Sequence, residues 1–256
     1  MTAAQDTGRD GDAAPHPIDA PGTAEWEWRS WRLLHELPVL DISQCPSVVV
    51  VAAHPDDEVL GAGGLLAMLA AARARLRLIA ITDGEASHPG LDRAAAGRLA
   101  EARVAETSAA LHRLGAPAEI VRLKMPDTGV ARREPEVRAA LSALVPGFQV
   151  CLAPWEGDLH ADHAAAGRAA RGPCATAGAR LLSYPIWMWH WAHPRDSRVP
   201  WERALRVPLS AEAARRKRAA IGCFTSQFRP RGPRRPPVLP PGVIAHFTRD
   251  QEVLIS

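Results

Sequence analysis

A histidine and three acidic residues follow directly on an apolar run near residue 50. The run spans Val48 to Ala53, and the next five residues are His54–Glu58. Burying three carboxyl groups beside a hydrophobic strand is unfavourable unless a cation or hydrogen-bond donors compensate them. His54 and Asp57 are three residues apart, so a turn can bring both to one divalent ion. Asp56 lies between them and is then free to act on a water molecule.

A second group of metal-binding residue types lies downstream, at Asp158–His163. Together the two groups supply the two histidines and one carboxylate that suit a catalytic zinc with an open coordination position. Iron and cobalt tolerate the same ligands, so the sequence leaves another divalent transition metal open. This combination predicts a metal-dependent hydrolase.

The elements that must position these groups alternate along the chain. The pattern predicts short apolar strands near residues 48–53, 76–81, 119–124, 150–154 and 181–188, with helices near 63–75, 92–114, 135–144 and 161–171. Such alternation predicts an α/β fold, a Rossmann-like and mostly parallel sheet with helices on both faces. Ligands of such sheets bind beyond the carboxyl ends of the strands. Both groups of polar residues follow predicted strands, so we expect the metal site at that edge.

The two motifs, His54–Glu58 and His160–His163, resemble those of the PIG-L (LmbE-like) family of zinc-dependent N-deacetylases. Further marks of the family occur in order at Thr82–Glu85, at Arg103-x-x-Glu106 and at Met125–Asp127. The resemblance covers about residues 48 to 171. It implies removal of an N-acetyl group from an amino-sugar-containing small molecule, such as one that contains N-acetylglucosamine.

The resemblance also implies roles for individual residues. The zinc ligands would be His54, Asp57 and His163. Asp56 would be the general base, and His160, oriented by Asp162, would face the oxyanion and the leaving amine. A cationic His160 can donate first to the oxyanion and then to the amine.

Four more residues are candidates for substrate contacts, and each has a structural alternative. Arg103 is a substrate contact, a buried brace or half of a solvated pair, and Asp127 is a substrate contact or a turn residue. Trp187 and Trp189 alternate as in a strand, so they would either stack on a sugar or pack in the core. Asp158 would either cap the following helix or assist the site, and capping is the favoured alternative.

Composition and segment boundaries complete the expectations. We expect residues 1–22 to be a disordered leader and residues 23–256 to form a single PIG-L-like deacetylase domain. Within that domain, residues 184–256 would be a variable region on the substrate side. Residues 243–247 and 252–255 are expected to add strand to the sheet edge. The polar N-terminal segment and the absence of an 18-residue apolar run favour a cytoplasmic protein without a membrane span. A homo-oligomer is left open.

Two other functions compete with deacetylation. One is a zinc amidase that cuts a larger acyl group or a thiol conjugate. A more distant one is non-catalytic binding of phosphate or nucleic acid through Arg215–Arg218 and Arg229–Arg235. Because these clusters lack interleaved aromatic residues and the net charge is only +3, we expect a small-molecule substrate and no nucleic-acid partner.

Overall fold

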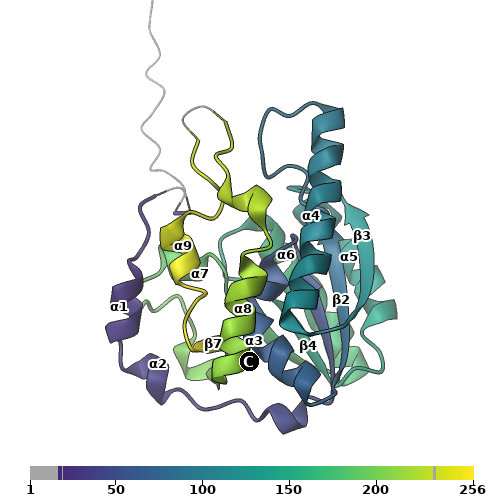
Figure 1. Ribbon diagram of the computed structural model, residues 1–256. Helices are drawn as coiled ribbons and strands as arrows, with labels where there is room; N and C mark the ends of the chain where they lie inside the picture. Colours follow the sequence, from purple (N-terminus) through teal and green to yellow (C-terminus); the bar gives the residue numbers. More distant parts are fainter. Residues whose placement is uncertain (1–16, 19, 233–234) are drawn as a thin grey trace, which may run out of the picture.

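A computed structural model describes residues 17–18, 20–232 and 235–256 (Figure 1). Most of the predicted leader at 1–22 therefore lies outside the described residues. The described strands form a seven-stranded sheet in the order β3-β2-β1-β4-β5-β7-β6. Their bounds are β1 Ser47–Ala52, β2 Arg75–Thr82, β3 Glu119–Met125, β4 Val150–Pro154, β5 Arg180–Tyr184, β6 Ala204–Pro208 and β7 Gln251–Ile255. The first five strands are parallel and β7 is antiparallel to its neighbours, which confirms the predicted mostly parallel sheet.

Helices pack on both faces of this sheet (Figure 1). The helices are α1 Glu25–Ser30, α2 Leu33–Glu36, α3 Asp57–Ala71, α4 Arg93–Leu114, α5 Glu134–Leu144, α6 Ala161–Ala177, α7 Met188–Trp191, α8 Ala211–Ile221 and α9 Pro241–Ala245, with short 3-10 turns η1 Ile42–Gln44, η2 Val130–Arg133, η3 Trp201–Arg203 and η4 Thr225–Phe228. None of the helices in these described ranges is long and apolar enough to cross a membrane.

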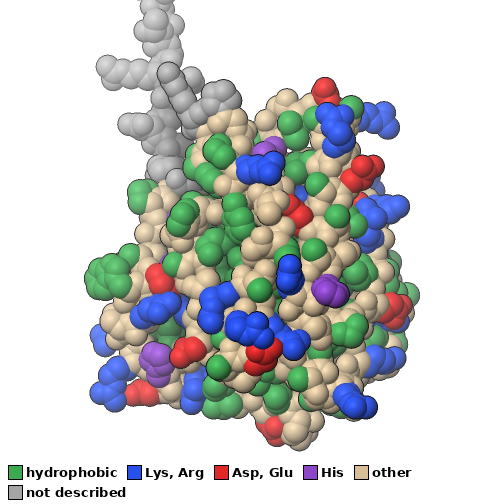
Figure 2. Space-filling view, viewed as in Figure 1, with side chains coloured by type: hydrophobic (Ala, Val, Ile, Leu, Met, Phe, Trp, Pro, Cys, Tyr) green, Lys and Arg blue, Asp and Glu red, His purple; other side chains and the backbone are tan. Residues whose placement is uncertain are grey.

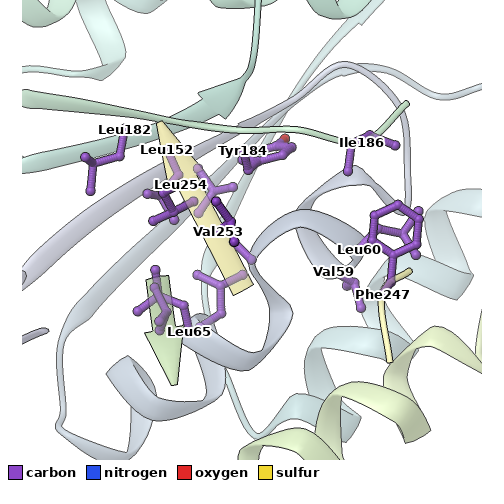
Figure 3. Close-up of a cluster of buried hydrophobic side chains, with 14 of the residues drawn as sticks. Val59, Leu60, Leu65, Leu152, Leu182, Tyr184, Ile186, Phe247, Val253 and Leu254 are labelled. Atoms are coloured by element: carbon purple, nitrogen blue, oxygen red, sulfur yellow. The ribbon is translucent and has the colours of Figure 1, made fainter. Parts of the chain in front are cut away.

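Strand β1 shows why both faces must be covered. Val48 and Val50 belong to a core cluster with residues of α3, α4 and α8, whereas Val49 and Val51 belong to a second cluster with α5 and α6. Successive side chains of a strand point to opposite faces, so an unbroken run of valines requires a helical layer on each side. Figure 3 shows the first cluster, where Leu65 of α3 lies near side chains of β4, β5 and β7.

The C-terminal third departs from the prediction. The strand expected at 181–188 ends at Tyr184, and Met188–Trp191 forms helix α7. The strand expected at 243–247 is instead helix α9, which begins at Pro241; a proline suits the first helical position because its missing N–H has no intrahelical partner there. Strand β7 lies between β5 and β6 rather than at the edge.

Two loops rise over the carboxyl ends of the parallel strands. The segment before α4 and the described residues 229–232 and 235–240 between η4 and α9 both extend above this edge of the sheet (Figure 1). The predicted polar motifs lie at the same edge, beneath these loops.

Candidate active site

The turn between β1 and α3 carries the first motif in a strained conformation. Asp56 has a φ of 112°, a region that residues other than glycine rarely adopt. Asp57 is the first residue of α3, and its Oδ2 accepts a 2.9 Å hydrogen bond from the backbone N–H of His54. The helix N-terminus favours negative charge at this point. Strain of this kind persists only where the surrounding structure holds it, and it concentrates at functional sites.

Three predicted ligands meet at one point. Nδ1 of His54 lies 3.2 Å from Nε2 of His163. Oδ1 of Asp57 lies 3.3 Å from that same Nε2, and its Oδ2 lies 3.6 Å from Nδ1 of His54. All three side chains are largely buried.

The outer nitrogens of both rings face carboxylates, and this decides what the inner nitrogens present. Nε2 of His54 lies 3.2 Å from Asp127 and 3.3 Å from Asp162, and Nδ1 of His163 lies 2.6 Å from Asp158. In neutral rings, the carboxylates hold the hydrogen on these outer nitrogens, so two lone pairs face each other beside Asp57. Lone pairs 3.2 Å apart repel unless a cation lies between them. The residues present therefore fit a divalent metal ion.

The electrostatics of both histidines favour positive charge at this point. Burial alone would lower the pKa of His163, but the charge of Asp57 and the hydrogen bond to Asp158 outweigh it and raise the pKa to about 9. Burial also opposes a charged His54, yet hydrogen bonds to Asp127 and Asp162 raise its pKa well above the ordinary value. Either a proton or a metal ion supplies the positive charge that the neighbouring carboxylates favour. A metal ion can in addition accept a lone pair from both rings at once.

Arg103 proves to be a buried brace for Asp56. Its Nη2 donates to Pro55 O at 2.6 Å and to Asp56 Oδ2 at 3.1 Å, and its Nη1 donates to Gly84 O at 2.9 Å. Gly84 has a φ of 73°, and a Cβ there would collide with Nη1 of Arg103. Burial raises the pKa of Asp56 to about 7, although the Arg103 charge acts to lower it.

His160 and Asp162 both lie in the site, but they do not pair as expected. Asp162 contacts His54, and its Oδ1 accepts the backbone N–H of Val130 at 3.1 Å. The buried Nδ1 of His160 has no hydrogen-bond partner among the described residues. Its ring centroid is 4.6 Å from that of His163. Burial and the neighbouring His163 lower the pKa of His160 to about 3, so the ring is neutral and carries one N–H to donate.

Asp158 does not cap α6, contrary to expectation. It is fully buried, and it accepts three backbone hydrogen bonds, from Ile186, Trp187 and Met188, in addition to its contact with His163. Its role is to hold His163 in place. The sequence did contain a signal for this contact, because Asp158 lies within the second metal motif. An acidic residue before a helix also matches a capping pattern, so the signal was not decisive.

The four candidate substrate contacts separate in the structure. Arg103, Asp127 and Trp187 line a common cavity with the metal-binding residues, although Asp127 is largely engaged by His54 and by the backbone N–H groups of Ala86 and Thr128. Trp189 is not in the lining. It is 4% exposed, and its ring packs edge-on against Trp28 at 5.0 Å. Of the two alternatives for Trp189, the structure shows packing in the core, because residues two apart share a face on a strand but not on a helix.

The cavity has a volume of about 670 Å³ and extends from the metal-binding residues to the C-terminal third. Its C-terminal wall comprises Gln227, Arg231, residues 236–240 and Val243. These residues lie within the predicted substrate-side region 184–256, but none of them could be named from the sequence. These residues carry no catalytic motif, so only the fold reveals their position.

Known proteins share this sequence pattern and this architecture. The family model described as PIG-L, GlcNAc-PI de-N-acetylase, matches residues 49–172. A curated relative, the 1D-myo-inositol 2-acetamido-2-deoxy-alpha-D-glucopyranoside deacetylase of Segniliparus rotundus, is 44% identical over 78 residues. That match covers 28% of this chain and 25% of the relative, so the chain spans about a quarter of the relative's length.

Solved structures of other proteins are similar to a larger part of this chain than the curated relative is. The conserved protein TT1542 from Thermus thermophilus has a TM-score of 0.58 and 29% identity, and covers 82% of this chain and 93% of its own. The N,N'-diacetylchitobiose deacetylase of Pyrococcus horikoshii has a TM-score of 0.56 over 82% of both chains; at 19% identity it shows the fold alone. Residues 49–172 thus match the PIG-L family model, and the sheet that carries them is similar to that of TT1542.

Proposed function

We propose that this protein is a metal-dependent hydrolase that removes an N-acetyl group from an amino-sugar-containing small molecule. The observation that carries the proposal is the pair of facing ring nitrogens of His54 and His163, 3.2 Å apart beside Asp57 and next to a braced Asp56. The names of the Segniliparus and Pyrococcus relatives both describe deacetylases of acetamido sugars, which supports the same substrate class.

His54, Asp57 and His163 would hold the ion, for which we propose zinc. A bound ion of this kind supplies a water of lowered pKa and polarises the amide carbonyl. Asp56 accepts a proton from the attacking water; Arg103 engages its Oδ2 and fixes its orientation. His160 faces the oxyanion and the departing amine with a ring that makes no other hydrogen bond through Nδ1 among the described residues. Asp162 acts on His54 rather than on His160.

The described residues support the two competing functions to different degrees. An amidase for a larger acyl group uses the same residues, and a cavity of about 670 Å³ accommodates such a group. Binding of phosphate through Arg215–Arg218 is disfavoured. Arg215 and Arg216 both donate to Glu212, and Lys217 is buried against Glu252.

Three predictions from the sequence join this proposal. We propose that residues 184–256 form the substrate side of a single domain spanning 23–256. A cytoplasmic location stays a prediction, and a homo-oligomer stays open.

The test compares wild type with Asp56→Asn, a substitution of similar shape. We expect one bound metal ion per chain in both proteins and release of acetate from N-acetylglucosaminyl compounds by wild type. Loss of a general base lowers kcat by about 10²–10⁴-fold. Asp196→Asn is the matched control, because Asp196 is buried, pairs with the exposed Arg198 and lies outside the cavity lining. Absence of bound metal in carefully prepared wild type, or full activity of Asp56→Asn, would contradict the proposal.

A further inference from the structure

The cavity lining combines two chemically distinct sets of residues. One set is acidic and comprises Asp56, Asp57, Asp127 and Asp162. The other is apolar and includes Leu159, Ile186, Trp187, Val238, Leu239 and Val243. We call these six residues the apolar wall.

Three residues of the apolar wall keep side-chain surface that the described residues do not cover. Leu159 is 39% exposed, although its side chain lines the cavity, and it is held there by a backbone φ of 61°. Trp187 and Val238 are half-buried, and both also pack on the main core cluster. Uncovered apolar surface that continues from a core into a cavity is stabilised by an apolar ligand group.

Charge is sparse in the rest of the lining. Beyond the four aspartates the described lining holds no acidic side chain, and its described arginines are Arg103 and Arg231. Nε of Arg231 already donates to Pro236 O at 2.8 Å. On the face shown in Figure 2, hydrophobic side chains gather over α9, whereas Lys and Arg side chains gather over the lower part of α8.

The segment that completes the apolar wall is fixed in place from two sides. The N–H of Leu239 donates to Gln227 O at 3.1 Å, which closes the loop at its base. Residues 225 and 226 in turn donate three hydrogen bonds to Glu106 of α4. Prolines at 236, 237 and 240 restrict the backbone between these contacts. A wall with little freedom to lose on binding favours affinity for a ligand that fits it.

We infer that the substrate carries an apolar group in addition to its amino sugar, and that the apolar wall binds it. The inference rests on the proposed function and specifies its substrate class. In an N-acylated amino sugar the apolar group is either the aglycone or the acyl chain. A free or purely polar amino sugar is then a poor substrate.

The experiment measures kcat/KM for three uncharged substrates: methyl N-acetylglucosaminide, its hexyl glycoside, and the methyl glycoside with an N-octanoyl group. We expect at least one of the two apolar compounds to exceed the methyl N-acetyl compound by about tenfold or more, because each methylene in an apolar pocket adds discrimination. The compound that gains identifies the source of the apolar group. In Val238→Asn the ratio of apolar to methyl substrate should fall several-fold. Val39→Asn is the matched control, because Val39 is 52% exposed and outside the cavity lining.

Equal kcat/KM for all three compounds in wild type would overturn the inference, as would an unchanged ratio in Val238→Asn. Failure of the proposed function has a different signature, namely no hydrolysis of any of the three by metal-loaded wild type. In that case, binding of hexyl glucosaminide by calorimetry still tests the apolar wall. Affinity above that of methyl glucosaminide, reduced by Val238→Asn but not by Val39→Asn, supports it, and equal affinities overturn it.

Discussion

Asp158 joins His163, a proposed metal ligand, to the chain that follows β5. Its two carboxylate oxygens receive the backbone N–H groups of residues 186–188, and Oδ2 also lies 2.6 Å from Nδ1 of His163. A carboxylate that orients a ligand histidine fixes which ring nitrogen is free for the metal and raises its basicity. Asp158 therefore links the geometry of the metal site to the start of α7.

Asp158→Asn should weaken metal binding while the protein stays folded. An amide accepts hydrogen bonds only at its oxygen, so the substituted side chain would present N–H groups to donors that now meet a carboxylate oxygen. Loss of such a partner lowers metal affinity by about 10–100-fold. The measurement is zinc affinity by competition with a chelator, with Asp196→Asn as control. An unchanged affinity in Asp158→Asn would show that His163 keeps its orientation without the charge.

Residue types revealed most of the site, and their partners stayed hidden. His54, Asp56 and Asp57 could be predicted because acids beside a buried strand need compensation, which few structures other than a metal site supply. Whether Arg103 is a brace or a substrate contact could not be predicted. The answer depends on the carbonyl of Gly84, 19 residues away in sequence, which accepts a hydrogen bond from Nη1 of Arg103. Pairing of Asp162 with His54 rather than His160 likewise depends on how two strand ends meet.

At the scale of elements, helix α3 is positioned by a buried ion pair. Glu252 of β7 accepts the N–H groups of Gly64 and Leu65 at 2.7 and 2.8 Å. Lys217 of α8 donates to Glu252 and to Leu60 O, both at 2.7 Å. The glycines permit this approach: a Cβ at Gly64 would collide with Leu209. Since α3 begins at Asp57, the pair holds the helix that carries this proposed metal ligand.

Glu252→Gln should destabilise the protein by about 3–5 kcal/mol, because it leaves the buried Lys217 charge uncompensated. The free energy of unfolding in urea, measured without added metal, gives this value. Glu212→Gln is the comparison: that carboxylate pairs with Arg215 and Arg216 on the surface, where such pairs contribute about 0–1 kcal/mol. Equal effects of the two substitutions would mean that the buried pair does not brace α3.

Sequence patterns predicted the secondary structure of the first half of the chain better than that of the second half. Strands β1, β2 and β4 could be predicted because both faces are buried and breakers bound them. The fold of the tryptophan-rich segment could not be predicted. Tryptophans two residues apart share a face on a strand, so their pattern fits a strand, but residues two apart lie on opposite sides of a helix such as α7. Strand β6 was missed, because its pairing partner, β7, lies far along the chain.

At the scale of the whole molecule, helix α1 is clamped to the segment before β7. Glu25 accepts hydrogen bonds from Nδ1 of His246 at 2.8 Å and from Nε and Nη2 of Arg249 at 2.8 and 2.6 Å. Arg249 also lies 4.1 Å above the ring of Trp189. Trp189 thus serves the packing of the two chain ends rather than the substrate.

This clamp should make stability depend on acid pH. Burial opposes the charge of Glu25, but hydrogen bonds from His246 and Arg249 outweigh it and lower its pKa from 4.5 to about 2. Because the folded value lies below the unfolded one, the contribution is complete above pH 4.5 and disappears as the pH falls toward 2. Between about pH 5.5 and pH 3.5, wild type should lose about 1 kcal/mol more of its unfolding free energy than Glu25→Gln. Urea unfolding at both pH values measures this, and Glu36→Gln, an exposed pair with Arg32, should follow wild type. Parallel losses in wild type and Glu25→Gln would mean that the clamp contributes no charge-dependent stability.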